Sequence, residues 1–140
     1  MVAGCVFCSI VAGETAAFAV LDDEVALAFL DVRPLFPGHV LVIPREHHVT
    51  LPDLPPQLVG PFFERVQRVA AALPSAMDAM GTFVAMNNVV SQSVLHLHVH
   101  VVPRTKGDGL RGFFWPRTKY RDDAHANEVA AAIRGALDHP

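Results

Sequence analysis

The sequence predicts an α+β fold built on a mainly antiparallel sheet. Stretches typical of strands come first, a helix follows, two more strands come next and a helix ends the chain, which is an order typical of α+β proteins. The 140 residues, of which 51% are hydrophobic, are enough for one hydrophobic core. No internal repeat, linker or low-complexity tract interrupts them. We therefore expect one domain over residues 1–140.

The first half of the chain carries three short apolar runs that predict strands. Residues 33–38 hold two prolines and a glycine, which exclude regular structure, and Pro44 stops the third run. The second and third runs are separated by about seven residues, so we expect them to pair in an antiparallel manner. The three strands are expected at residues 17–21, 25–30 and 39–43.

A long amphipathic helix follows, because apolar residues recur at spacings of three and four with charged residues on the opposite face. Pro61 lies either in its first turn or at a kink, and Pro74 is expected to end it. The apolar positions are Leu58, Val59, Phe62, Phe63, Val66, Val69, Ala70 and Leu73.

The second half predicts two more strands and a final helix. The strands are expected at residues 82–87 and 94–104, joined by a short loop at residues 88–92. An irregular stretch then runs to about residue 120. Asp122 or Asp123 is expected to cap the last helix, whose apolar stripe is Val129, Ile133 and Leu137.

Three histidines alternate with apolar residues in the strand at 94–104. Alternate side chains of a strand share a face ~6.5–7 Å apart, so His96, His98 and His100 are expected on one face. A core avoids packing several imidazoles whose nitrogens all need partners, which disfavours a purely structural role. The outer two lie about 13 Å apart, so at most two of the three bind one metal ion. The other hypothesis is nucleophilic catalysis, in which a neutral imidazole attacks phosphorus and forms a covalent phosphoramidate.

Both cysteines of the chain lie in one C-x-x-C pattern near the N-terminus, Cys5 and Cys8. A disulfide is disfavoured in a cytoplasmic protein, and a thioredoxin-like redox pair would normally follow a strand. Half of a zinc site is the third interpretation, and it requires two further ligands. The candidates for these ligands are His47, His48 and His96.

Charge and hydropathy exclude some classes of partner. The net charge of −3 argues against general nucleic-acid binding, and no apolar run approaches the roughly 20 residues that span a bilayer. No signal-peptide pattern is visible, so we expect a cytoplasmic protein. Residues 104–121 nevertheless hold six basic residues and one acidic residue, together with Phe113, Phe114 and Trp115. A basic segment directly after the histidines suits a phosphate-bearing ligand.

Residues 92–104 resemble the signature of the histidine triad (HIT) family of nucleotide hydrolases and transferases, in which three histidines alternate with apolar residues. Residues 5–10 with Gly13 and Glu14 resemble the opening of that family, and residues 29–34 and 37–44 resemble its second block. The resemblance runs from Cys5 to about Tyr120. It implies a homodimer whose subunits each hold a five-stranded antiparallel sheet, a long helix and a C-terminal helix.

The resemblance also implies roles for individual residues. His98 would be the nucleophile on the α-phosphorus, His100 would contact phosphate, and His39 would help to position the triad. Asp31 would hold the ribose hydroxyls. The base would be walled by Phe7, Ile10, Phe29 and Leu30, and the phosphate or leaving group would be contacted by Asn87, Gln92 and Ser93. One departure concerns the loop at residues 88–91, which lacks the glycines usual in the family.

The resemblance further implies a structural zinc ion, because some bacterial members bind zinc through equivalents of Cys5, Cys8, His47 and His96. It implies no organic cofactor. The predicted function is that of a hydrolase or nucleotidyl transferase with a covalent nucleotidyl-His98 intermediate, acting on purine nucleoside phosphoramidates or dinucleoside polyphosphates. The alternatives are a zinc-dependent hydrolase and a nucleotide-binding regulatory or interaction protein with weak catalysis.

Overall fold

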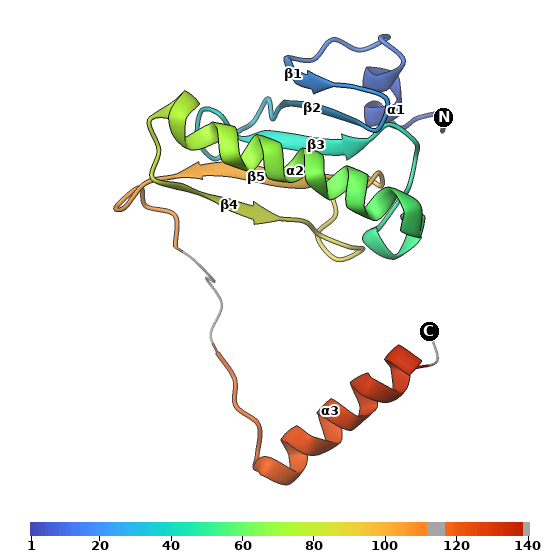
Figure 1. The fold of residues 1–140 in the computed structure, drawn as a ribbon, viewed down its shortest axis with the longest axis vertical. Coiled ribbons are helices and arrows are strands. Elements are labelled where there is room, and N and C mark those ends of the chain that lie inside the picture. Colours follow the sequence, from blue (N-terminus) through green and yellow to red (C-terminus); the bar gives the residue numbers. More distant parts are fainter. Residues whose placement is uncertain (112–116, 139–140) are drawn as a thin grey trace. The chain divides into compact units, whose positions relative to one another are not determined.

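The computed structural model describes residues 1–111 and 117–138, in two compact units that divide between Asp108 and Gly109 (Figure 1). The first unit holds every strand of the described chain and two α-helices, and the second holds the C-terminal helix. The expectation of one domain over the whole chain stays a prediction. The described part of the chain contains no helix that is both long enough and apolar enough to cross a bilayer.

The first unit is built on a five-stranded antiparallel sheet in the order β1-β2-β3-β5-β4 (Figure 1). Every neighbouring pair of strands runs antiparallel. The α+β class and the antiparallel sheet predicted from the sequence are therefore confirmed. The strands are β1 (Ala19–Asp22), β2 (Ala26–Leu30), β3 (Val40–Pro44), β4 (Gly81–Ala85) and β5 (Val99–Arg104).

The core lies between the sheet and the long helix α2 (Pro56–Met77), which crosses one face of the sheet (Figure 1). Leu97, Val99 and Val101 point into this core and are fully buried against α2 residues such as Phe62 and Val66. A second apolar cluster lies on the opposite face, where Phe7 packs with residues of β2 and β3. The histidines that alternate with the core residues belong to the functional site described below.

Helix α2 excludes the prediction that Pro61 lies in the first turn, and it ends later than predicted. It begins at Pro56, so Pro61 lies well inside it, and it continues through Pro74 to Met77. Pro61 follows Gly60 inside the helix, and a glycine has no Cβ to collide with the proline ring. The helix ends where Asp78 adopts a left-handed conformation, with φ 51° and ψ 46°, and its N–H bonds back to the Pro74 carbonyl. The prediction that Pro74 ends the helix was wrong.

Two further differences concern the segments that carry chemistry. A short helix, α1 (Val6–Val11), follows Cys5, whose Sγ accepts a hydrogen bond from the Cys8 N–H at 3.4 Å. The sequence pattern predicted no helix there. The predicted strand at 94–104 is a strand only from Val99 onward, so His96 and His98 precede β5 in an irregular segment. Alternation of buried apolar and histidine side chains nevertheless continues through that segment.

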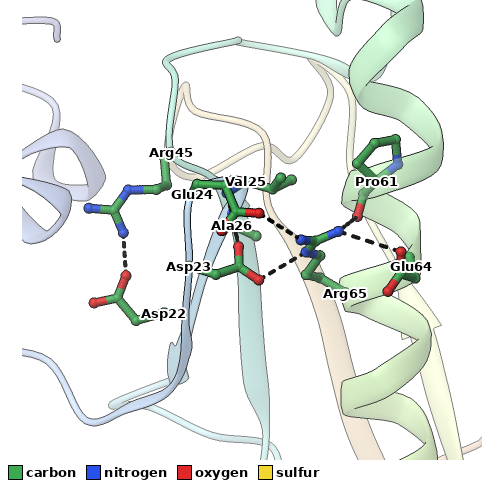
Figure 2. Close-up of polar contacts among 9 residues, drawn as sticks. All are labelled: Asp22, Asp23, Glu24, Val25, Ala26, Arg45, Pro61, Glu64 and Arg65. Atoms are coloured by element: carbon green, nitrogen blue, oxygen red, sulfur yellow. Dashed lines mark hydrogen bonds and ion pairs between the residues drawn. The ribbon is translucent and has the colours of Figure 1, made fainter.

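An ion-pair cluster fastens α2 to the turn between β1 and β2 (Figure 2). Arg65 lies 3.0 Å from the Asp23 carboxylate and 3.4 Å from that of Glu24, and it donates to the Pro61 carbonyl at 3.1 Å. Arg45, directly after β3, pairs with Asp22 at the end of β1. Partial burial works against the ionised form of Asp23, but N–H groups of Ala26 and Val25 and the Arg65 guanidinium together hold its pKa below the ordinary value.

The second unit contains α3 (Asp123–Asp138), as the sequence predicted. Asp122 precedes the helix, and its carboxylate accepts the N–H of His125 at 2.7 Å, which is an N-cap contact. Ile133, in the predicted apolar stripe, is exposed.

Candidate active site and metal cluster

A cavity of about 310 Å³ opens beside the histidines, between α1, the segment before β1 and the end of β2. Its walls are mostly apolar, while a carboxylate, two hydroxyl-bearing side chains and two imidazoles also line it. Eight of the predicted site residues line it: Phe7, Ile10, Phe29, Leu30, Asp31, Ser93, His98 and His100.

The aromatic wall forms because α1 lays Phe7 against the sheet. The Phe7 ring meets Phe29 edge-on at 5.5 Å between ring centres and meets His98 at 5.2 Å. Phe7 and Phe29 are both buried, so the wall is preformed. Sequence reasoning missed other lining residues, among them Thr15, Ala17, Val32, Leu41 and Val94. These small or apolar residues carry no chemical signature, and only their position in the fold assigns them to the cavity.

His98 has its hydrogen fixed by the backbone. Its Nδ1 lies 2.8 Å from the carbonyl oxygen of His96. A carbonyl oxygen only accepts, so Nδ1 carries the hydrogen and donates it. In the neutral ring, Nε2 then keeps its lone pair. The side chain is 3% exposed, which limits competition from solvent for that lone pair.

A chain of hydrogen bonds also fixes the hydrogens of His39 and His100. The Leu35 N–H donates to Nδ1 of His39 at 3.1 Å, so the hydrogen of the neutral His39 ring is on Nε2. That Nε2 lies 2.9 Å from Nδ1 of His100, which therefore accepts. The neutral His100 ring consequently carries its own hydrogen on Nε2, where it is a donor for an anionic oxygen.

Asp31 lies at the polar side of the cavity. One carboxylate oxygen accepts the Arg33 N–H at 2.9 Å, and the other lies 3.7 Å from Nε2 of His39. Burial lowers the pKa of His39, although the nearby Asp31 carboxylate acts in the opposite direction. Burial, together with the neighbouring histidines, lowers the pKa of His100 to about 4. Both rings are therefore neutral at pH 7, as the hydrogen-bond chain requires.

A second cluster gathers the four predicted metal ligands. Ligand atoms of Cys5, Cys8, His47 and His96 all lie within 4.8 Å of one another. The Cys8 sulfur is 3.2 Å from Nδ1 of His47 and 3.7 Å from Nδ1 of His96. The neighbouring His48 is not in the cluster; its ring faces Glu46 at 3.4 Å.

The donor set fits a structural zinc ion. Two thiols and two imidazoles are a ligand set common in tetrahedral zinc sites, and spacings of 3–4 Å between ligand atoms match bonds of about 2.0–2.3 Å. His96 is fully buried, and its Nε2 donates to the Pro44 carbonyl at 2.8 Å, which leaves Nδ1 as the ligand atom. Burial raises the pKa of the Cys8 thiol and lowers that of His96 to about 4. A cation would favour the thiolate and balance this burial.

His96 joins the metal cluster to the cavity. Its ring belongs to the cluster, while its backbone carbonyl holds the His98 ring. The Leu97 N–H donates to the His48 carbonyl at 2.7 Å, which anchors the same segment to the residues after β3. The position of His98 therefore depends on how His96 is held.

Two side chains of the loop before the histidines bond to the backbone, and their predicted contact with the phosphate or leaving group stays a prediction. The Gln92 amide donates to the Val49 carbonyl and accepts the Val89 N–H at 2.9 Å, and Asn87 donates to the Ser91 carbonyl at 3.1 Å. Neither Gln92 nor Asn87 lines the cavity, since their side chains shape the loop. Ser93 does line it. Val89 and Ser91 adopt positive φ angles of 71° and 62°, in the loop where the sequence lacks glycine.

The basic segment after β5 is only partly described. Arg104 pairs with Asp108 at 2.7 Å. Phe113, Phe114 and Trp115 lie outside the described residues, so the predicted use of this segment for a phosphate-bearing ligand stays a prediction.

Comparison with known proteins agrees with this geometry. A model of the HIT domain family matches residues 12–107. The chain belongs to the HIT family. It is 42% identical over 108 residues to a HIT-like protein from Mycobacterium tuberculosis, with 76% of this chain and 75% of the relative covered.

Two HIT relatives carry names that state an activity. An adenylylsulfatase from Arabidopsis thaliana is 31% identical over 140 residues, which cover 95% of this chain and 69% of the relative. An adenosine 5'-monophosphoramidase from Saccharomyces cerevisiae is 31% identical over 116 residues, which cover 81% of this chain and 71% of the relative.

Solved HIT structures share the fold. A HIT family protein from Bacillus anthracis superposes with a TM-score of 0.88 at 29% identity, covering 97% of this chain and 99% of that one. A zinc-bound histidine triad protein from Mycobacterium smegmatis superposes with a TM-score of 0.73 at 38% identity, covering 92% and 97%. The second structure shows that a HIT protein can bind zinc.

Proposed function

We propose that this HIT protein hydrolyses nucleoside phosphoramidates, or related nucleotides such as dinucleoside polyphosphates, through a covalent nucleotidyl-His98 intermediate. The observation that carries the proposal is the bond from Nδ1 of His98 to the His96 carbonyl. It leaves a nucleophilic lone pair on Nε2 of a ring that lines the cavity. The printed activities of the two named relatives agree with this choice of chemistry.

The first step transfers the nucleotidyl group to the protein. Nε2 of His98 attacks the α-phosphorus, a phosphorus–nitrogen bond to the ring forms, and the bond to the leaving amine breaks. The amine keeps the electron pair and takes up a proton. A water molecule then attacks phosphorus, loses a proton and releases the nucleoside monophosphate, which restores the His98 lone pair.

The neighbouring groups orient the nucleotide and stabilise charge. The Nε2 hydrogen of His100 is the donor that we assign to a phosphate oxygen in the transition state. Asp31 accepts hydrogen bonds from the ribose hydroxyls, and Phe7 and Phe29 wall the base. Ser93 adds a hydroxyl donor beside the phosphate. His39 is a positioning residue, because it fixes the hydrogens of His100.

We propose that zinc binds at Cys5, Cys8, His47 and His96 and cross-links α1 to the segments around His47 and His96. Zinc would act here as a structural ion. We also propose a cytoplasmic homodimer formed through α2 and β4. Apolar side chains exposed on and next to these elements, Val84 and Met80 among them, support such an interface.

The test of the covalent step is the variant His98→Ala. We expect its turnover of adenosine phosphoramidate to fall by about 10⁴-fold or more, since loss of a nucleophile removes the whole pathway. Acid-quenched wild-type protein should show a nucleotidyl adduct by intact-mass spectrometry, and the variant should show none. His125→Ala in the second unit is the control and should react as the wild type does. Full turnover by His98→Ala would refute the proposal.

A second candidate function is a metal-dependent hydrolase, which one observation favours. Asp31, His39 and His100 also place ligand atoms within 4.8 Å of one another. This function predicts a second metal ion per chain, lost in His100→Ala, and activity that returns when metal is restored after chelation. A nucleotide-binding protein without catalysis predicts instead tight binding of AMP with no turnover in the wild type.

A further inference from the structure

The two cysteines of the metal cluster line a small cavity near the N-terminus, with a volume of about 220 Å³. Among the described residues, the lining of this cavity has no member in common with that of the nucleoside cavity. Cys5 is half-buried, whereas Cys8 is only 3% exposed. A reagent that enters this cavity therefore meets the sulfur of Cys5 first.

The two cysteines are placed to form a disulfide without movement of the backbone. Cys5 is the N-cap of α1, and Cys8 lies in the first turn of that helix. Residues three apart in a helix have Cα atoms about 5 Å apart, within the range of roughly 4.4–6.8 Å that disulfides span. The Cys5 sulfur already accepts the Cys8 N–H at 3.4 Å. Only side-chain rotation is then needed to join the two sulfur atoms, which lie within 4.8 Å of each other.

A disulfide between the two cysteines and a metal ion in the cluster exclude each other. Cys5 and Cys8 supply two of the four ligand atoms, and both must be thiolates to bind zinc. A disulfide sulfur carries no such charge, so His47 and His96 would be the ligands that remain in the cluster. Formation of the disulfide therefore releases an ion that the four residues bind.

The cysteine pair is also connected to the proposed nucleophile. Phe7 stands between the two cysteines in the chain, and its ring contacts those of His96 and His98 at 5.9 and 5.2 Å between ring centres. The ring of His96 belongs to the cluster, while its carbonyl accepts the hydrogen of Nδ1 of His98. A change at the cysteines therefore reaches the nucleoside cavity through Phe7 and through His96.

We propose that Cys5 is a site of modification by low-molecular-weight disulfides, and that Cys8 resolves the adduct to a Cys5–Cys8 disulfide that expels zinc and slows turnover. The inference rests on the proposed zinc site and the proposed function. A disulfide is disfavoured in a reducing compartment, so the modified form is expected only under oxidation.

The modification is two successive thiol–disulfide exchanges. The Cys5 thiolate attacks one sulfur of the reagent, whose sulfur–sulfur bond breaks and whose other half leaves as a thiolate. The Cys8 thiolate then attacks the Cys5 sulfur of the mixed disulfide and displaces the second half. The two cysteines lose two electrons, and the reagent is reduced to two thiols, each of which takes its proton from solvent.

The experiment treats the wild-type protein with bis(2-hydroxyethyl) disulfide, which is small and uncharged, and follows the thiols by alkylation and intact-mass spectrometry. We expect an intramolecular disulfide to form and the bound zinc, measured with a chromogenic chelator, to be released at the same rate. Turnover of adenosine phosphoramidate should fall by about tenfold or more as the disulfide forms. Dithiothreitol followed by zinc should restore both the thiols and the turnover.

Two variants identify the sulfur that reacts first. Cys8→Ser should keep half of the reagent as a mixed disulfide on Cys5, because no second thiol displaces it. Cys5→Ser should react about tenfold more slowly, because the remaining thiol of Cys8 is buried. Cys5→Ala and Cys8→Ala repeat the comparison if a serine variant melts early. His48→Gln, next to the cluster, is the control and should behave as the wild type does.

The outcomes separate this inference from the proposals on which it rests. Thiols that stay open to alkylation, or zinc that stays bound after the disulfide forms, would overturn it. Equal reaction rates of Cys5→Ser and Cys8→Ser would overturn Cys5 as the modified residue, and turnover that the disulfide leaves unchanged would overturn the link to catalysis. Wild-type protein without zinc would refute the metal site, and wild-type protein without turnover would refute the proposed function. The thiol measurements decide the modification of Cys5 in either case.

Discussion

At the scale of single residues, the site depends on hydrogens that the backbone places. The Leu35 N–H fixes His39, His39 fixes His100, and the His96 carbonyl fixes His98. Each imidazole has two nitrogens of opposite hydrogen-bonding character, so these contacts decide which atom attacks and which atom donates. None of the three contacts involves a charged partner.

The buried histidines predict how stability responds to pH. Burial lowers the pKa of His39 and lowers that of His100 to about 4, from an unfolded value near 6.5. Between these values the unfolded chain binds more protons than the folded chain, so the free energy of unfolding falls as the pH drops from about 6.5 toward 4. Above about 6.5 these groups cause no pH dependence.

Urea denaturation of metal-free protein at pH 7.5 and pH 5 measures this effect. The variant His39→Gln/His100→Gln should lose less stability on acidification than the wild type. His125→Gln, in the second unit, should lose as much as the wild type. An equal loss in the double variant and the wild type would contradict the assignment to these two rings.

At the scale of elements, the loop before the histidines stores strain. Val89 holds φ at 71°, which is costly for a β-branched residue, and its side chain is 73% exposed, so little packing offsets that cost. Glycine adopts this conformation freely. We expect Val89→Gly to be more stable than Val90→Gly by about 1–2 kcal/mol in chemical denaturation.

The two variants are matched, because Val90 is the same residue type, adjacent in the chain and 78% exposed, without a positive φ. Glycine raises the conformational entropy of the unfolded chain similarly at both positions, so this destabilising effect cancels in the comparison. Equal stabilities of the two variants would mean that the loop carries no strain at residue 89.

The ion-pair cluster of Figure 2 predicts a link between α2 and the β1–β2 turn. Arg65→Gln removes the cation that faces Asp23, whose carboxylate is 22% exposed. We expect its free energy of unfolding to fall below that of the wild type. Arg68→Gln, one turn along on the exposed side of the same helix, should stay within about 0.5 kcal/mol of the wild type. If Arg65→Gln and Arg68→Gln changed the free energy of unfolding equally, the Arg65 ion pairs would contribute nothing to stability.

At the scale of the whole molecule, the metal cluster ties together segments that are far apart in the sequence. Cys5 caps α1, His47 follows β3 and His96 precedes β5. We expect purified protein to hold one zinc ion per chain by elemental analysis, and chelation to lower the melting temperature. Cys8→Ser should lose the zinc, whereas His48→Gln should keep it. A melting temperature that chelation does not change would refute a structural role.

Much of this architecture was predictable from the sequence, because the spacing of apolar residues and the positions of the chemically reactive side chains are both visible there. The alternation of histidines with Leu97, Val99 and Val101 predicted which side chains face the core. The C-x-x-C pattern left three histidines as candidate metal ligands, and the family resemblance selected His47 and His96 among them. Sequence patterns could not show that α2 ends at Asp78 and not at Pro74. The cap at Asp78 depends on a left-handed backbone conformation, which no residue type at that position announces. They also could not show that Gln92 bonds to Val49, since that contact joins distant segments.

The chain of bonds from Leu35 to His100 has a consequence for the loop between β2 and β3. Pro34 and Pro37 each fix one backbone φ angle in this loop, and a third proline at position 35 would fix another. Proline has no N–H, however, so at that position His39 would be free to turn its hydrogen toward the loop, and His100 would lose its donor. The placement of these hydrogens thus begins at the main-chain N–H of a residue that does not line the cavity, and it sets a requirement on residue 35 that side-chain chemistry would not reveal.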